Sequence, residues 1–162
     1  MKYTFKYNDN LDVDEIIIEH NADSSIIENI HQYLNDHQKS YATLKLLKGD
    51  EQYYLKVSDI LFFETESAVV YAHTKSDAYE CEYRLYELEE KLPSEFIRVS
   101  KSSICNTKAV LAISRFLNAS GTIRFINSHK EIYVSRKFYN DLKISLEKRN
   151  TLWKEINRNF SD

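Results

Sequence analysis

The sequence predicts a mainly β fold with α-helices: a series of short strands, a short internal helix, an N-terminal strand–helix extension and a C-terminal helix. Three observations support this fold class. From residue 41 onward, short β-type segments are separated by turn residues about every 8–12 positions, which is the pattern of an all-β unit. One helical segment interrupts them, and apolar residues at helical spacing occur near both ends of the chain. The length of 162 residues suits one domain.

The first 40 residues are predicted to form the extension. Residues 15–19 (Glu-Ile-Ile-Ile-Glu) have the pattern of a short buried strand. Asp23 or Ser24 then offers an N-cap to an amphipathic helix, whose apolar positions are Ile26, Ile27, Ile30, Tyr33 and Leu34. This unit is too small to fold alone, so we expect it either to pack on the β segments that begin near residue 41 or to act as a dimerisation arm.

Residues 41–162 are predicted to form the main domain. Its candidate strands are 42–47, 52–56, 60–65, 68–74, 78–82, 96–99, 102–105, 109–116, 121–126 and 131–134. The segment 84–92 is predicted to be a helix because its leucines share one face, and Pro93 ends it. A last helix is expected from near Ser135 to about residue 158.

Several classes of site are excluded or disfavoured by composition. Only two glycines are present, so glycine-rich phosphate-binding loops are excluded. The five histidines show no zinc-ligand spacing, and neither cysteine has a histidine at a recognised catalytic spacing. We therefore expect no catalytic residue, no metal, no cofactor and no small-molecule substrate. Two cysteines without a CxxC pair, no membrane-spanning apolar run and no signal peptide favour the cytoplasm.

Charge is segregated along the chain, although its formal net charge is only −3. Residues 1–40 carry a net charge of −5 and residues 41–95 a net charge of −6. Residues 96–162 carry 13 basic and 5 acidic side chains, a net charge of +8. A basic third on an acidic protein indicates a polyanionic partner such as nucleic acid. The alternative is a lysine-rich terminal helix that is solvated on its outer face.

Two places in the basic third combine cations with small polar residues. The first is residues 98–103, where Arg98 and Lys101 can contact phosphates or guanine edges and Ser102 can position a phosphate; the alternative is a polar hairpin corner. The second is Arg136 and Lys137, which follow Ser135 where the last helix begins. Two cations in a first turn oppose the helix dipole, which favours a site for an external anion. The alternative is compensation by an acidic residue one turn later, at position 141.

Three segments, in this order, resemble the LytTR-type DNA-binding domain of bacterial transcriptional regulators. They are RLYELEEKLP at 84–93, FIRVSKSSICN at 96–106 and VSRKFY at 134–139, with DILFFE at 59–64 upstream. The resemblance covers about residues 42–147. It implies an elongated fold of small antiparallel sheets, in which loops and strand ends enter successive major grooves and no recognition helix is used.

By the same resemblance, Lys101 and the neighbouring Ser102 would lie on one DNA-contacting loop, which Arg98 precedes. Arg136 would lie on the other, with Lys137 supporting it. The loop at Glu66-Ser67 would be a third contact region, although it departs from the more basic or histidine-bearing loop of some relatives.

The number of residues before the β segments bears on how the protein would be regulated. Many family members carry a phosphorylatable receiver domain, whereas only about 40 residues precede the β segments here. We therefore expect a stand-alone regulator, a branch whose genes often neighbour a small membrane protein that would be its regulator. The prediction is a non-enzymatic, sequence-specific regulator that binds double-stranded DNA as a homodimer. The alternative is a protein-interaction module in which the N-terminal helix and the acidic surface of residues 41–95 bind a regulatory, possibly membrane, partner.

Overall fold

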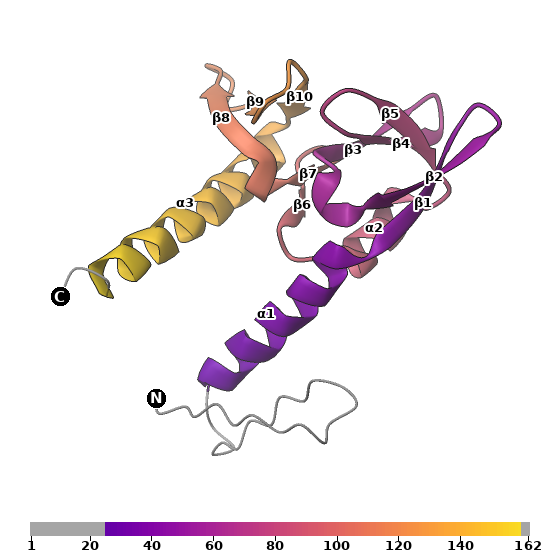
Figure 1. The fold of residues 1–162 in the computed structure, drawn as a ribbon. Helices are drawn as coiled ribbons and strands as arrows, with labels where there is room; N and C mark the ends of the chain where they lie inside the picture. Colours follow the sequence, from indigo (N-terminus) through magenta and orange to yellow (C-terminus); the bar gives the residue numbers. More distant parts are fainter. Residues whose placement is uncertain (1–24, 160–162) are drawn as a thin grey trace, which may run out of the picture.

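The computed structural model describes the backbone of residues 25–159 and the side chains of residues 27–148. The predicted strand at 15–19 lies outside the described residues. Within them, ten strands form two antiparallel sheets, accompanied by three α-helices (Figure 1). The predicted fold class is confirmed. None of the described helices is long and apolar enough to cross a membrane.

Every predicted strand from residue 42 onward is present, with ends that differ by two residues at most. The strands are β1 (Thr43–Lys48), β2 (Glu51–Lys56), β3 (Phe62–Glu66), β4 (Val69–His73), β5 (Ala78–Cys81), β6 (Phe96–Arg98), β7 (Ser103–Asn106), β8 (Val110–Arg115), β9 (Gly121–Phe125) and β10 (Glu131–Val134). The helices are α1 (Ser25–Tyr41), α2 (Leu85–Lys91) and α3 (Arg136–Asn159). Two short 3₁₀ turns, η1 (Val57–Asp59) and η2 (Thr107–Ala109), were not predicted.

The larger sheet has the strand order β2-β1-β5-β4-β3-β7-β6, and the smaller sheet has the order β10-β9-β8. One face of the larger sheet packs on α2. This face buries Phe63 of β3 and Ile104 of β7, and Leu88 of α2 completes the same core. Side chains alternate between the two faces of a strand, so the neighbours of these residues point the other way.

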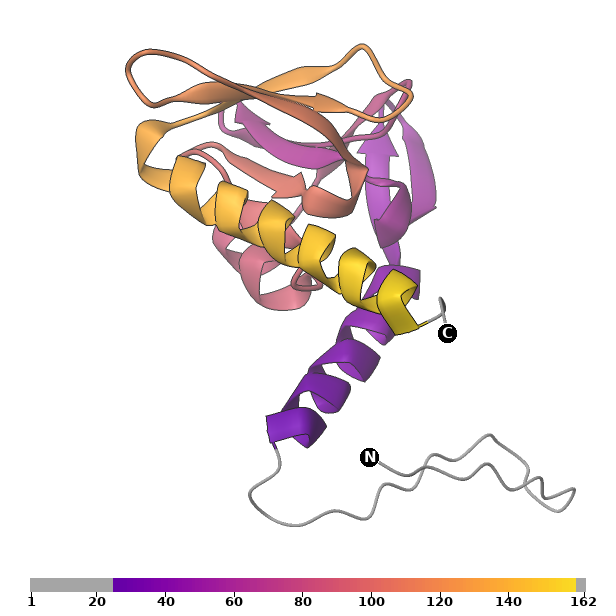
Figure 2. The ribbon, with the colours of Figure 1, turned by 90° about the vertical axis from the view of Figure 1, so that its left-hand side faces the viewer.

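The opposite face of β3 and β7 meets the smaller sheet and α3 in a second core. Phe62 and Cys105 come from the larger sheet, Ile123 and Phe125 from the smaller one, and Leu142 from α3. Burying an apolar side chain of this size contributes roughly 1.5–3 kcal/mol. In Figure 2, α3 runs alongside the strands of the smaller sheet. This second core therefore fixes where α3 begins relative to the larger sheet.

Gly121 lets β9 lie close to α3. A Cβ atom at this position would lie 2.2 Å from the Ser114 backbone oxygen and 2.8 Å from a Tyr139 ring carbon. Both distances are shorter than the contacts that Cβ atoms make in proteins, so a side chain here would force a strand or the Tyr139 ring to move. The glycine is thus required by packing on both sides of β9.

We expect Leu142→Ala to reduce the free energy of unfolding by about 2–5 kcal/mol, because Leu142 is fully buried and its truncation leaves a cavity. The matched control is Ile144→Ala on the same helix, where the side chain is 51% exposed and the loss should stay below about 1 kcal/mol. Urea unfolding followed by circular dichroism measures both. Equal losses for the two variants would contradict the packing of α3 described above.

Candidate nucleic-acid interface

The first predicted basic site is a tight loop between β6 and β7. The backbone N–H groups of Val99 and Ser100 donate to the Ser103 carbonyl at 3.0 and 3.3 Å. The Ser100 hydroxyl accepts a hydrogen bond from the Ser102 N–H at 3.1 Å and donates to the Ser103 hydroxyl at 3.0 Å. Ser100 and Ser103 are buried, Ser102 is half-buried, and Lys101 is exposed. The serines therefore close the turn and leave the lysine free to reach outward.

Arg98 shapes this loop from the end of β6. Its Nε donates to the Ser100 carbonyl at 2.7 Å, and its Nη2 donates to the Lys101 carbonyl. Its Nη1 forms an ion pair with Glu89 of α2 at 2.9 Å. All three guanidinium nitrogens thus have protein partners, and the side chain is only 22% exposed.

The second predicted site, where α3 begins, is joined to the first by a backbone hydrogen bond. The Ser135 N–H donates to the Val99 carbonyl at 2.9 Å, so the chain enters α3 beside the β6–β7 loop. Arg136 and Lys137 follow, and both are exposed. Among side chains 27–148, neither forms a salt bridge, so Asp141 does not compensate them through an ion pair. The positive charges of Arg136 and Lys137 are unfavourable beside the positive end of the helix dipole, and they remain available to bind an anion.

The β3–β4 hairpin is the third segment at this place. Ser67 and Ala68 form its two-residue loop with φ values of 47° and 73°, a conformation typical of tight hairpin turns. The Thr65 N–H donates to the Ser102 carbonyl at 2.8 Å, which ties the hairpin to the β6–β7 loop. Arg84, directly before α2, donates from Nη1 to the Ala68 carbonyl at 3.0 Å.

Side chains from these segments surround one open hollow of about 590 Å³. Four cations line it, with a single carboxylate, that of Glu89; the cations are Arg84, Arg98, Lys101 and Lys137. The structure therefore brings together residues that lie more than fifty positions apart in the sequence. Arg84 was not singled out by sequence reasoning, because it lies in an acidic region and reads as the first residue of a helix.

Comparison with known protein families assigns this chain to one of them. The model of the LytTr DNA-binding domain matches residues 50–147. The chain belongs to the LytTr DNA-binding domain family. The match includes the β6–β7 loop, the start of α3 and the β3–β4 hairpin, so all three segments around the hollow lie inside the family domain.

Relatives of this LytTr protein are bacterial and are named as regulators. An uncharacterized HTH-type transcriptional regulator of Staphylococcus aureus strain MRSA252 is 32% identical over 118 residues, which cover 72% of this chain and 78% of the relative. A second, from strain bovine RF122 / ET3-1, is 30% identical with the same coverage. The LytTr DNA-binding domain of a methyl-accepting/DNA response regulator from Bacillus cereus has a TM-score of 0.60 at 22% identity, covering 65% of this chain and 96% of that domain.

The family assignment and these relatives point to a DNA-binding regulator and not to an enzyme. Between Ser25 and Asn159, no two α-helices follow one another along the chain, since strands separate α1, α2 and α3. This part of the chain therefore holds no helix-turn-helix, and a DNA contact within it must use other elements.

We expect Arg98→Lys to loosen the β6–β7 loop, because lysine keeps the charge but cannot bridge the Ser100 and Lys101 carbonyls. Losing about 1 kcal/mol of hydrogen bonding should raise amide exchange in residues 99–102 by roughly fivefold. Hydrogen-exchange mass spectrometry measures this change. Arg124→Lys, at an exposed arginine of β9, is the control, and an equal change in both variants would contradict the clamping role of Arg98.

Proposed function

We propose that this LytTr protein is a sequence-specific transcriptional regulator that contacts successive major grooves of double-stranded DNA through loops. The observation that carries the proposal is the hydrogen bond between the Ser135 N–H and the Val99 carbonyl at 2.9 Å. It joins the β6–β7 loop, which carries Lys101, to the start of α3, which carries Arg136. Two exposed cations from distant parts of the chain therefore share one side of the domain.

The residues divide into different roles. Lys101 and Arg136 are proposed to read bases, because arginine and lysine can donate to the O6 and N7 atoms of guanine. Ser102 and Lys137 are proposed to contact phosphates, which position the protein without reading sequence. Arg98 is proposed to act mainly by holding the loop, since its guanidinium nitrogens are already bonded within the protein.

We further propose that the chain works as a cytoplasmic homodimer on repeated DNA sites, with residues 1–40 as the extension and residues 41–162 as the DNA-binding domain. Support comes from α1, whose C-terminal part is fastened to the segment before β6. Asp36 accepts from the Ser94 N–H at 3.1 Å, and the Ser40 hydroxyl donates to Glu95 at 2.7 Å. From there α1 projects away from the sheets (Figure 1), which leaves its length available to a second copy or to a small membrane protein.

The main test is DNA binding by Arg136→Ala. We expect this variant to lose about 1–3 kcal/mol of binding free energy on the promoter fragment upstream of its own gene, and to discriminate less at one base position. Fluorescence anisotropy against a scrambled duplex measures both effects. Arg124→Ala, which removes an exposed arginine from the smaller sheet, should bind like the wild type. Equal losses on the promoter and on the scrambled duplex would contradict base reading by Arg136.

The salt dependence of binding separates this function from the protein-interaction alternative. Neutralising four to five phosphates predicts that the logarithm of the binding constant falls with a slope of about −4 against the logarithm of salt concentration. Lys137→Ala, at the lysine proposed to contact a phosphate, should weaken binding to the promoter and to the scrambled duplex alike, and it should flatten this slope by about one. Weak binding without sequence preference at every salt concentration would favour a protein partner as the ligand of this domain.

A further inference from the structure

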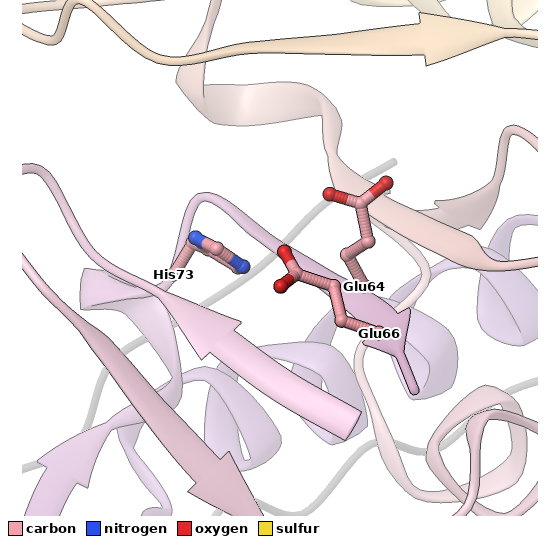
Figure 3. A group of neighbouring side chains, drawn as sticks. All are labelled: Glu64, Glu66 and His73. Carbon is pink, nitrogen blue, oxygen red and sulfur yellow. The ribbon is translucent and has the colours of Figure 1, made fainter. Parts of the chain in front are cut away.

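Three side chains of metal-ligating types meet on the β3–β4 hairpin, and the roles in DNA binding proposed above use none of them. Glu64 and Glu66 lie two residues apart on β3, so they share one face of the strand. His73 on β4 lies opposite Phe62 in the antiparallel register and therefore points to the same face. One donor atom from each of the three residues lies within 4.8 Å of the others. In Figure 3 the Glu66 carboxylate points toward the His73 ring, and the Glu64 carboxylate lies beyond it, pointing toward the top of the view.

The His73 ring is held in place but lacks a hydrogen-bond partner for its buried Nε2 atom. It stacks on Phe62 with ring centroids 4.2 Å apart and an interplanar angle of 11°. Burial, with a smaller contribution from the charge of Lys130, lowers the pKa of His73 to about 4. A buried polar atom without a partner is rare in folded proteins, and a bound water or ion is one physical explanation of it.

The carboxylates of Glu64 and Glu66 lie close together. Burial raises the pKa of Glu64, the Ser103 hydroxyl opposes this shift by donating to Glu64 at 3.2 Å, and the charge of Glu66 adds to the rise. Glu66 is exposed, and no hydrogen bond or ion pair joins its carboxylate to another described side chain. The nearby ammonium of Lys130 donates to the Asp77 carbonyl. An added cation would relieve the repulsion between the two glutamates.

We propose that Glu64, Glu66 and His73 bind one divalent transition-metal ion of the zinc type. Zinc takes histidine nitrogen and carboxylate oxygen at about 2.0–2.2 Å in tetrahedral geometry, so two donors on one ion lie roughly 3.3–3.6 Å apart. Rotation of the exposed Glu66 side chain would bring the donor atoms together from the 4.8 Å spread observed here. The imidazole ligand favours zinc over Mg²⁺ and Ca²⁺, which prefer oxygen ligands only.

A chain of hydrogen bonds connects this site to the loop of Lys101. The Ser100 hydroxyl donates to the Ser103 hydroxyl, which donates to Glu64. Such outer partners orient metal ligands, so ion binding should also order the β6–β7 loop. It should in addition neutralise carboxylates on the hairpin that borders the basic hollow, which favours DNA binding. This second consequence rests on the function proposed above.

The site is tested by metal binding to the full, untagged chain. Protein stripped with EDTA is titrated with ZnCl₂ by isothermal calorimetry, and bound metal is counted after dialysis. We expect one ion per chain for the wild type and for the control Glu80→Gln, which changes an exposed glutamate on β5. Glu66→Gln and His73→Gln should bind at least about tenfold more weakly. Because Glu66 is exposed, its variant should fold even if the His73 variant does not. No binding, or equal binding by Glu66→Gln and the wild type, overturns the site.

A second arm measures DNA binding with and without ZnCl₂, using MgCl₂ as the control ion. We expect zinc to tighten DNA binding of the wild type by about threefold or more and to leave Glu66→Gln unaffected. Stoichiometric zinc binding without a change in DNA affinity overturns the coupling but not the site. If the chain binds zinc but binds no DNA, with or without zinc, the proposed function is contradicted and the metal site is still supported.

Discussion

The hydrogen bond from the Ser135 N–H to the Val99 carbonyl organises the candidate interface. It is a contact between main-chain atoms, so its geometry depends on where β6 ends and where α3 begins. The second core sets both positions, because Leu142 anchors α3 against the smaller sheet and Cys105 anchors β7 against the same core. Without this packing, the loop carrying Lys101 and the turn carrying Arg136 would move independently. A DNA surface made of loops needs such support, since loops alone rarely hold side chains in fixed positions.

Local charge, and not net charge, distinguishes this domain. The chain as a whole is slightly acidic, yet four cations surround the hollow between α2, the β3–β4 hairpin and the β6–β7 loop. The acidic remainder should reduce indiscriminate binding to polyanions, while the hollow and the adjacent Arg136 concentrate attraction at one place. The Glu64–Glu66–His73 group borders this region on β3 and β4. A change in the charge of this group would therefore change the electrostatic attraction between the basic hollow and DNA.

Much of the fold could be predicted because its signals are local. Short β-type segments bounded by turn residues predicted every strand from residue 42 onward, and Pro93 marked the end of the internal helix. The charged loops could be predicted because residues 98–103 and 135–137 are each contiguous in sequence. Arg84 and the Glu64–Glu66–His73 group could not be, since the first depends on the position of α2 beside the β3–β4 hairpin and the second on the pairing of β3 with β4. The role of Arg98 also needed the structure, because sequence alone does not reveal that its guanidinium bonds to its own loop.

The central claim is that one continuous surface, formed by two linked loops, binds DNA. The most direct measurement is two-dimensional NMR of the ¹⁵N-labelled chain, titrated with a duplex selected by the protein itself. The account predicts that amide signals of residues 99–102 and 135–138 shift together and saturate at the same duplex concentration, while those of α1 stay unchanged. Shifts confined to α1 or to the β1–β2 hairpin would contradict it, because DNA would then bind away from the linked loops.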